Sequence, residues 1–164
     1  MSIIALISYV LQVTFLNYIG IYNIKPNLIV ITTISYALIR GKEEGAVYGL
    51  FSGLLLDILG GKVIGLFALM GMILGLTIGY LNKNLYNENY LVAIALTACG
   101  TFVYNLVYFI IWHFGYVQSQ FGWYLISYII PETIYNTAFS IFIYFLILYI
   151  NKKIDYYKKL TRLY

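Results

Sequence analysis

The chain has 164 residues, of which 62% are hydrophobic and only 10% are charged, and its formal net charge is +4. A soluble globular domain carries about 25% charged residues, so this chain has too little polar surface to face water on all sides. The composition excludes a soluble domain and indicates an all-α polytopic membrane protein.

The apolar tracts predict about six transmembrane helices, because a span needs about 20 apolar residues and somewhat fewer where the bilayer thins. In chain order, the expected spans are residues 3–21, 27–39, 46–59, 63–81, 90–114 and 124–150, with a basic tail at 151–164. The whole chain, 1–164, would then be a single membrane domain. The second and third tracts are short and could instead form one hairpin that does not fully cross.

The first tract begins almost at Met1, without a basic n-region or a clear cleavage site. It therefore predicts a retained first helix and not a cleaved signal peptide. Six spans put both termini on the same side, and the positive-inside rule places the basic tail in the cytoplasm. Only Lys25 and Lys62 of the ten basic residues then lie outside. If the second and third tracts formed a re-entrant hairpin, the N-terminus would move outside.

Polar residues recur at helical spacing in three of the expected spans. They are Ser8 and Gln12 in the first span, Thr97, Thr101 and Asn105 in the fifth, and Glu132, Asn136 and Ser140 in the sixth. Because polar side chains are costly in lipid, we expect these rows to face the bundle interior. Pro131 should kink the last helix or start its regular part, which frees a carbonyl that a neighbour must satisfy.

Glycines recur every four residues in the third and fourth tracts. They are Gly41, Gly45, Gly49 and Gly53, and then Gly71, Gly75 and Gly79. Glycine ridges let transmembrane helices approach closely. A short turn joins the two tracts, so we expect antiparallel neighbours whose ridges face each other or a third helix. Packing within the chain is the first interpretation, and docking of a partner's transmembrane helix is the alternative.

Asp57 lies inside the apolar stretch GLLLDILGG at residues 53–61. An intramembrane carboxylate is a functional candidate by default, but the expected end of the span at Leu59 places Asp57 within a turn of the outer interface. A carboxylate near a helix C-terminus is disfavoured by the helix dipole, so we expect compensation by Lys62, a polar neighbour or water. A polar lock on the turn is the first interpretation, a partner contact the second, and proton or ligand chemistry the third.

The sequence contains no Walker loop, HExxH, CxxC or GxSxG motif, and we expect no enzyme activity, cofactor or metal. Asp57 and Glu132 could form an acid–base pair in an intramembrane enzyme, but they come from different depths. With His113 and Lys62 they map toward the outer end of the bundle. A small-molecule-binding or transport subunit is therefore the alternative to a scaffold.

Several short motifs together resemble the bacterial rod shape-determining protein MreD family. They are Pro26-Asn27-Leu28, the break at Arg40-Gly41, GxxxGxxxGLLLD at 45–57 and Gly65. Gln12 and the short basic C-terminus also fit this family. The resemblance covers the chain in length and span order, and its specific part is residues 26–65.

The resemblance implies a fold similar to the S-component of energy-coupling-factor transporters. It also implies a non-catalytic subunit of the cell-wall elongation machinery in the bacterial cytoplasmic membrane. The expected partner is an MreC-like bitopic protein, which connects indirectly to the RodA glycosyltransferase, a penicillin-binding transpeptidase and MreB filaments. Membrane lipids are expected partners, and nucleic acid is not.

Overall fold

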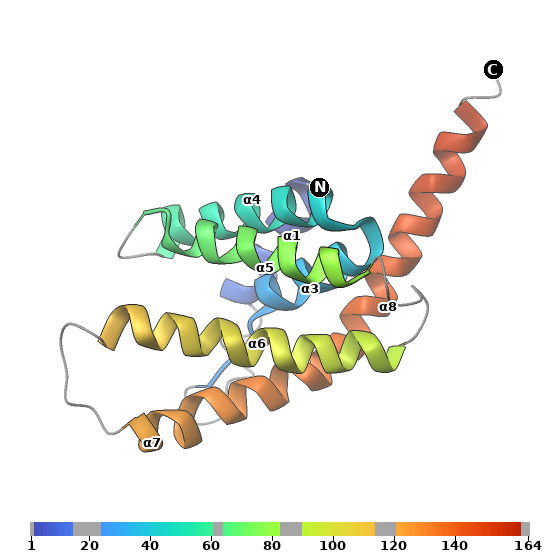
Figure 1. The fold of residues 1–164 in the computed structure, drawn as a ribbon. Helices are drawn as coiled ribbons and strands as arrows, with labels where there is room; N and C mark the ends of the chain where they lie inside the picture. The colour runs from blue at the N-terminus through green and yellow to red at the C-terminus, as the bar shows by residue number, and fades with distance from the viewer. Residues whose placement is uncertain (1, 15–23, 61–63, 83–89, 114–120, 162–164) are drawn as a thin grey trace.

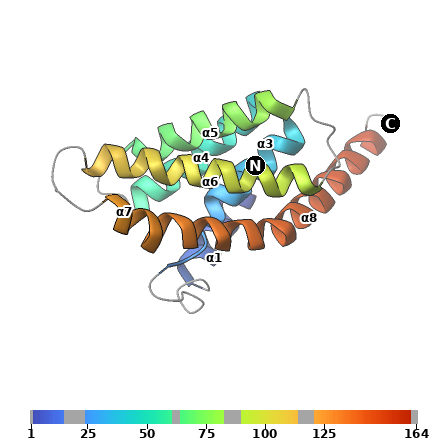
Figure 2. The same cartoon turned by 60° about the horizontal axis from the view of Figure 1, so that its bottom comes forward.

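The structure is a computed structural model that describes residues 2–14, 24–60, 64–82, 90–113 and 121–161. Six helical segments account for nearly all of these residues, which confirms the predicted all-α class. They are α1 (Ser2–Thr14), α3 (Leu28–Arg40), α4 (Lys42–Gly60), α5 (Leu66–Asn82), α6 (Tyr90–His113), and the continuous run of α7 (Phe121–Tyr124), η1 (Leu125–Ile129) and α8 (Ile130–Thr161). Figures 1 and 2 show their arrangement.

Two of the described helices are long and apolar enough to cross a membrane, over Tyr90–Ile111 and Phe121–Ile154. Three shorter apolar helices accompany them, at Ile4–Thr14, Leu28–Arg40 and Leu66–Leu81. Residues 15–21 of the first expected span lie outside the described residues.

α3 is the central helix of the molecule. It packs against α1, α4, α5, α6 and α8, and every residue from Leu28 to Leu38 is buried. A helix that is apolar on all sides belongs inside a bundle. At 13 residues α3 is about 20 Å long, which is shorter than the hydrocarbon core of a bilayer, about 30 Å thick. The burial of Leu28 to Leu38 shows that other helices surround α3 over most of its length.

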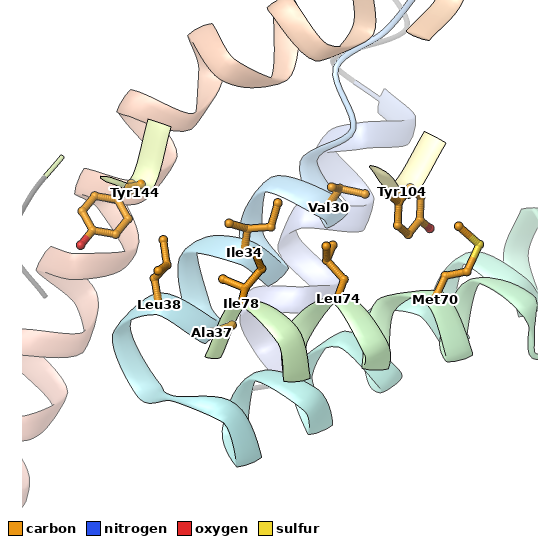
Figure 3. Close-up of a cluster of buried hydrophobic side chains, with 10 residues drawn as sticks. Val30, Ile34, Ala37, Leu38, Met70, Leu74, Ile78, Tyr104 and Tyr144 are labelled. Atoms are coloured by element: carbon orange, nitrogen blue, oxygen red, sulfur yellow. The ribbon is translucent and has the colours of Figure 1, made fainter. Parts of the chain in front are cut away.

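The main hydrophobic core lies between α3 and α5, as Figure 3 shows. Both helices contribute rows of side chains four residues apart, and α6 and α8 each add a tyrosine. The labelled members are Val30, Ile34, Ala37 and Leu38 on α3, Met70, Leu74 and Ile78 on α5, Tyr104 on α6 and Tyr144 on α8. On α5 this apolar row lies one residue before the glycine row, so α5 presents large side chains to α3 and glycines elsewhere.

The last helical segment runs without interruption from Phe121 to Thr161, and its C-terminal part projects beyond the rest of the bundle (Figure 1). The helix thus continues through most of the expected basic tail. Its π-helical part, η1, precedes Pro131 by one residue, and the N–H of Ile130 bonds to the carbonyl of Leu125. Because proline lacks an N–H and displaces the preceding turn, the wider π turn lets the helix pass through Pro131.

Candidate functional site

The glycines of α4 and α5 lie against one another along what we call the glycine seam, formed by Gly45, Gly49 and Gly53 on α4 and Gly71, Gly75 and Gly79 on α5. A Cβ atom added at Gly49 would overlap the carbonyl group of Gly71, and one added at Gly71 would overlap that of Gly49. Gly45 and Gly75 are related in the same way. Residue numbers rise along α4 and fall along α5, so the helices are antiparallel and their backbones touch.

The glycine seam also rests on α3. A Cβ atom added at Gly45 would lie 2.6 Å from the Cβ of Ala37, and one at Gly49 would lie 3.1 Å from the Cγ2 of Thr33. Beside this contact, the hydroxyls of Thr33 and Ser52 are hydrogen-bonded at 3.2 Å. The α4 ridge is therefore enclosed by two helices of its own chain.

Gly41 and Gly65 serve a different purpose from the seam glycines. Their φ angles are +88° and +99°, and a Cβ atom at either position would meet open space. Left-handed backbone of this kind is strongly disfavoured for residues with a Cβ. Gly41 continues the four-residue spacing of the ladder, but the structure places it at the corner between α3 and α4, where its N–H bonds to the carbonyl of Ala37 at 2.9 Å.

Asp57 binds the beginning of α5. Its Oδ1 accepts a hydrogen bond from the N–H of Phe67 at 3.1 Å, and its Oδ2 accepts one from the N–H of Ala68 at 2.9 Å. The residue is only 2% exposed. The first N–H groups of a helix have no partner within the helix and carry partial positive charge. The carboxylate of α4 therefore supplies the cap that α5 needs.

This arrangement identifies the compensation that the position of Asp57 requires. The C-terminus of α4 disfavours a carboxylate, but the antiparallel neighbour brings the N-terminus of α5 to the same place. Lys62, one of the three compensating groups expected from the sequence, lies outside the described residues. The sequence does carry the missed signal, since a helix that starts just after a tight turn offers its free N–H groups to the last turn before it.

The N-terminus of α3 is held inside the bundle by side chains from α1 and α8. Asn27 caps its own helix, with Oδ1 accepting from the N–H of Val30 at 3.3 Å, and its N–H donates to Oδ1 of Asn136 at 2.7 Å. Gln12 accepts from the N–H of Ile29 at 3.3 Å. Pro26 is buried at this point and has no N–H to satisfy. The Pro26-Asn27-Leu28 sequence thus starts a helix whose first N–H groups find hydrogen-bond partners within the protein and not in water.

The other end of α3 is tied to α8 by a bond that the sequence did not suggest. Nε of Arg40 donates to Oδ1 of Asn151 at 2.9 Å, and Nδ2 of Asn151 donates to the carbonyl of Ile147 at 3.0 Å. Asn151 is only 3% exposed. This Arg40–Asn151 bridge fixes the C-terminal end of α3 against α8.

The expected polar rows face one another to different degrees. Thr101 and Asn136 are fully buried and lie 3.5 Å apart at Oγ1 and Nδ2. Asn105 of α6 lies beside the half-buried Glu132 of α8, within hydrogen-bonding reach of its carboxylate. No group of three potential metal ligands occurs among the described residues.

Comparison with known proteins identifies one family. Residues 1–154 match the family described as rod shape-determining protein MreD. No curated protein and no solved structure matches the chain. Because the match covers nearly the whole chain, the protein belongs to the MreD family of rod shape-determining proteins, which are membrane proteins and part of the MreBCD shape complex.

Proposed function

We propose that this protein is a non-catalytic, multi-pass scaffold of the cell-wall elongation machinery. It binds an MreC-like bitopic partner and links that partner to peptidoglycan synthases, and both of its termini lie in the cytoplasm. Arg40, Lys42, Lys152 and Lys153 supply the basic inner surface in this orientation. The Arg40–Asn151 bridge supports this orientation, because the bridge brings the basic end of α3 and the basic part of α8 together.

The observation that carries the proposal is the way the bundle uses its polar groups. Asp57, Asn27, Asn136 and Gln12 bond to helix termini or to one another, while large apolar side chains cover the outside. Polar side chains that hold helix ends together build a rigid frame. An apolar exterior suits contacts with lipid and with the transmembrane helix of a partner.

The partner's contact site lies on the exposed faces of the helices, because α3 and α5 already cover the glycine ridge of α4. Exposed apolar positions occur on each of the long helices except α3, and representatives are Ile7 on α1, Phe51 on α4, Val103 on α6 and Phe142 on α8. Each is at least half exposed, so a larger side chain there leaves the core intact.

Site-specific photocross-linking in living cells tests this proposal. A photoreactive phenylalanine analogue is placed at Phe51, Val103 or Phe142 in turn, and at the buried Ile34 as a matched control. We expect at least one exposed position to cross-link to the MreC-like protein and Ile34 to give none. If cells remain rod-shaped while no exposed position on any helix yields that product, the protein does not bind the partner directly through its helices.

A second candidate is a small-molecule-binding subunit similar to the S-component of energy-coupling-factor transporters. The pair of Asn105 and Glu132 favours it, because an amide and a carboxylate side by side in an apolar bundle are groups that orient a bound small molecule. A stoichiometric bound metabolite in native mass spectra of the purified protein would support this candidate, and a clean spectrum in mild detergent would support the scaffold.

A further inference from the structure

A shallow groove lies on the surface of α4 and α5, beside the end of the glycine seam nearest Gly79. It has a volume of about 460 Å³ and is lined by Lys42, Leu76, Thr77, Tyr80 and Leu81. We call it the Lys42 groove. Its walls are almost entirely apolar, and Lys42 is the one charged residue that lines it.

The polar atoms near the groove leave Lys42 as its one cationic group among the described residues. The hydroxyl of Thr77 bonds to the carbonyls of Ile73 and Leu74 at 2.9 and 3.0 Å, so its hydrogen-bonding capacity is used within α5. Lys42 is exposed and forms no ion pair with the residues that the structure describes. The ammonium group is therefore available to a ligand.

The neighbouring acids point elsewhere. Successive residues of an α-helix are about 100° apart, so Glu43 and Glu44 turn away from Lys42. Glu44 accepts a hydrogen bond from the hydroxyl of Tyr36 on α3, and neither carboxylate lines the groove. An anion beside Lys42 would not meet them directly.

An exposed apolar track leads away from the groove along α5. Leu69, Ile73, Leu76 and Tyr80 lie on one face, at spacings of four, three and four residues, and each is at least 40% exposed. From Leu69 to Tyr80 the helix rises about 16 Å. That length is about half of the hydrocarbon thickness of a bilayer, so it matches the depth of one leaflet.

We propose that the Lys42 groove binds an anionic phospholipid, with its phosphate at Lys42 and an acyl chain along the α5 track. A lysine beside an interfacial tyrosine suits a phosphate group at the membrane surface, and the track offers apolar contact over the length of one chain. This site requires the membrane but not the MreC-like partner. In the proposed orientation Lys42 lies on the cytoplasmic side, so the lipid would belong to the cytoplasmic leaflet, and only this assignment rests on the proposed function.

Native mass spectrometry of the purified full-length protein tests the site. Phosphatidylglycerol and phosphatidylcholine with identical chains are added in mild detergent. A basic residue near an anionic lipid surface contributes enough for about a fivefold change in affinity. We expect phosphatidylglycerol to bind preferentially, Lys42→Gln to weaken its binding about fivefold, and Lys42→Arg to retain it.

Lys153→Gln is the matched control. Lys153 is exposed on α8, so this substitution removes the same charge at a position away from the groove. The proposal is overturned if Lys42→Gln and Lys153→Gln have equal effects, or if both lipids bind the wild-type protein equally. It is also overturned if inorganic phosphate at millimolar concentration displaces the lipid completely, since the groove would then be a soluble-anion site. A photoactivatable phosphatidylglycerol should label residues 76–81, and labelling confined to α8 would contradict the assignment.

Discussion

At the scale of single residues, Asp57 shows how a buried charge can be structural. Its two oxygens meet two consecutive N–H groups at the start of α5, where the helix dipole favours negative charge. The same carboxylate lies in the last turn of α4, where the dipole of its own helix opposes it. The two direct bonds to α5 offset both the opposing dipole of α4 and the cost of burying the carboxylate.

Removing this cap should destabilise the α4–α5 hairpin. We expect Asp57→Ala to lower the free energy of unfolding by about 2 kcal/mol, since it loses two hydrogen bonds to a charged group and leaves buried N–H groups unpaired. Asp57→Asn should lower the free energy of unfolding by less, because the carbonyl oxygen of the amide still accepts one hydrogen bond. The free energy of unfolding is measured by titrating the detergent-solubilised protein with a denaturing surfactant.

Glu43→Gln provides the comparison for Asp57, because Glu43 is an exposed carboxylate on the same helix. Its effect should be a few tenths of a kcal/mol. Equal stability of Asp57→Ala and Glu43→Gln would show that the capping bonds contribute nothing.

At the scale of helices, the glycine seam decides how α4 and α5 pair. Leaving out side chains lets two backbones come into contact, and dispersion and close packing then hold the helices together. The large side chains of α5 occupy the neighbouring row and fill the core against α3. One helix therefore makes two different contacts with two adjacent rows of residues.

A single methyl group in the seam should force these helices apart. We expect Gly49→Ala to destabilise the protein by about 1 to 3 kcal/mol, because the added Cβ overlaps the carbonyl of Gly71 and backbone atoms cannot step aside. Gly122→Ala is the control of opposite sign. Gly122 is helical and a Cβ there meets open space, so the substitution should be neutral or stabilise by up to about 1 kcal/mol.

Two measurements compare the stability of Gly49→Ala and Gly122→Ala. They are the midpoint of surfactant-induced unfolding and the cellular level of each variant. If both variants unfold at the wild-type midpoint, α4 and α5 do not pack through Gly49. A selective loss of partner binding at unchanged stability would instead make the ridge a docking face.

At the scale of the whole molecule, the helical class and many helix bounds follow from the apolar tracts and their punctuation. Helical spacing also indicates which residues form a ridge, as for Gly45, Gly49 and Gly53. Spacing alone did not show that Gly41 lies outside the helix, because the chain's direction at a corner depends on φ and not on periodicity. The sequence gives no hint of that angle beyond the glycine itself.

Contacts between distant segments were beyond prediction from this sequence. Arg40 and Asn151 are 111 residues apart, and the sequence around each residue does not indicate that it contacts the other. The bond from Asn27 to Asn136 spans 109 residues, and spacing predicted only that Asn136 faces inward. Such pairs are chosen by how the helices pack in three dimensions, which a hydropathy pattern does not specify.

The central claim is that the ridge side of α4 lies inside this protein and is not a surface for a partner. The Thr33 and Ser52 hydroxyls, 3.2 Å apart, allow a direct measurement by disulfide formation in living cells. Cys99 is first replaced by Ala. Cysteines are then placed at both positions or at Ser52 alone, in cells whose MreC-like protein carries cysteines along its transmembrane helix, and a membrane-permeant oxidant is added. We predict a disulfide within the chain from Thr33→Cys with Ser52→Cys, and no product between chains from Ser52→Cys alone. An interchain product from Ser52→Cys to the MreC-like protein, in cells that remain rod-shaped, would contradict the account.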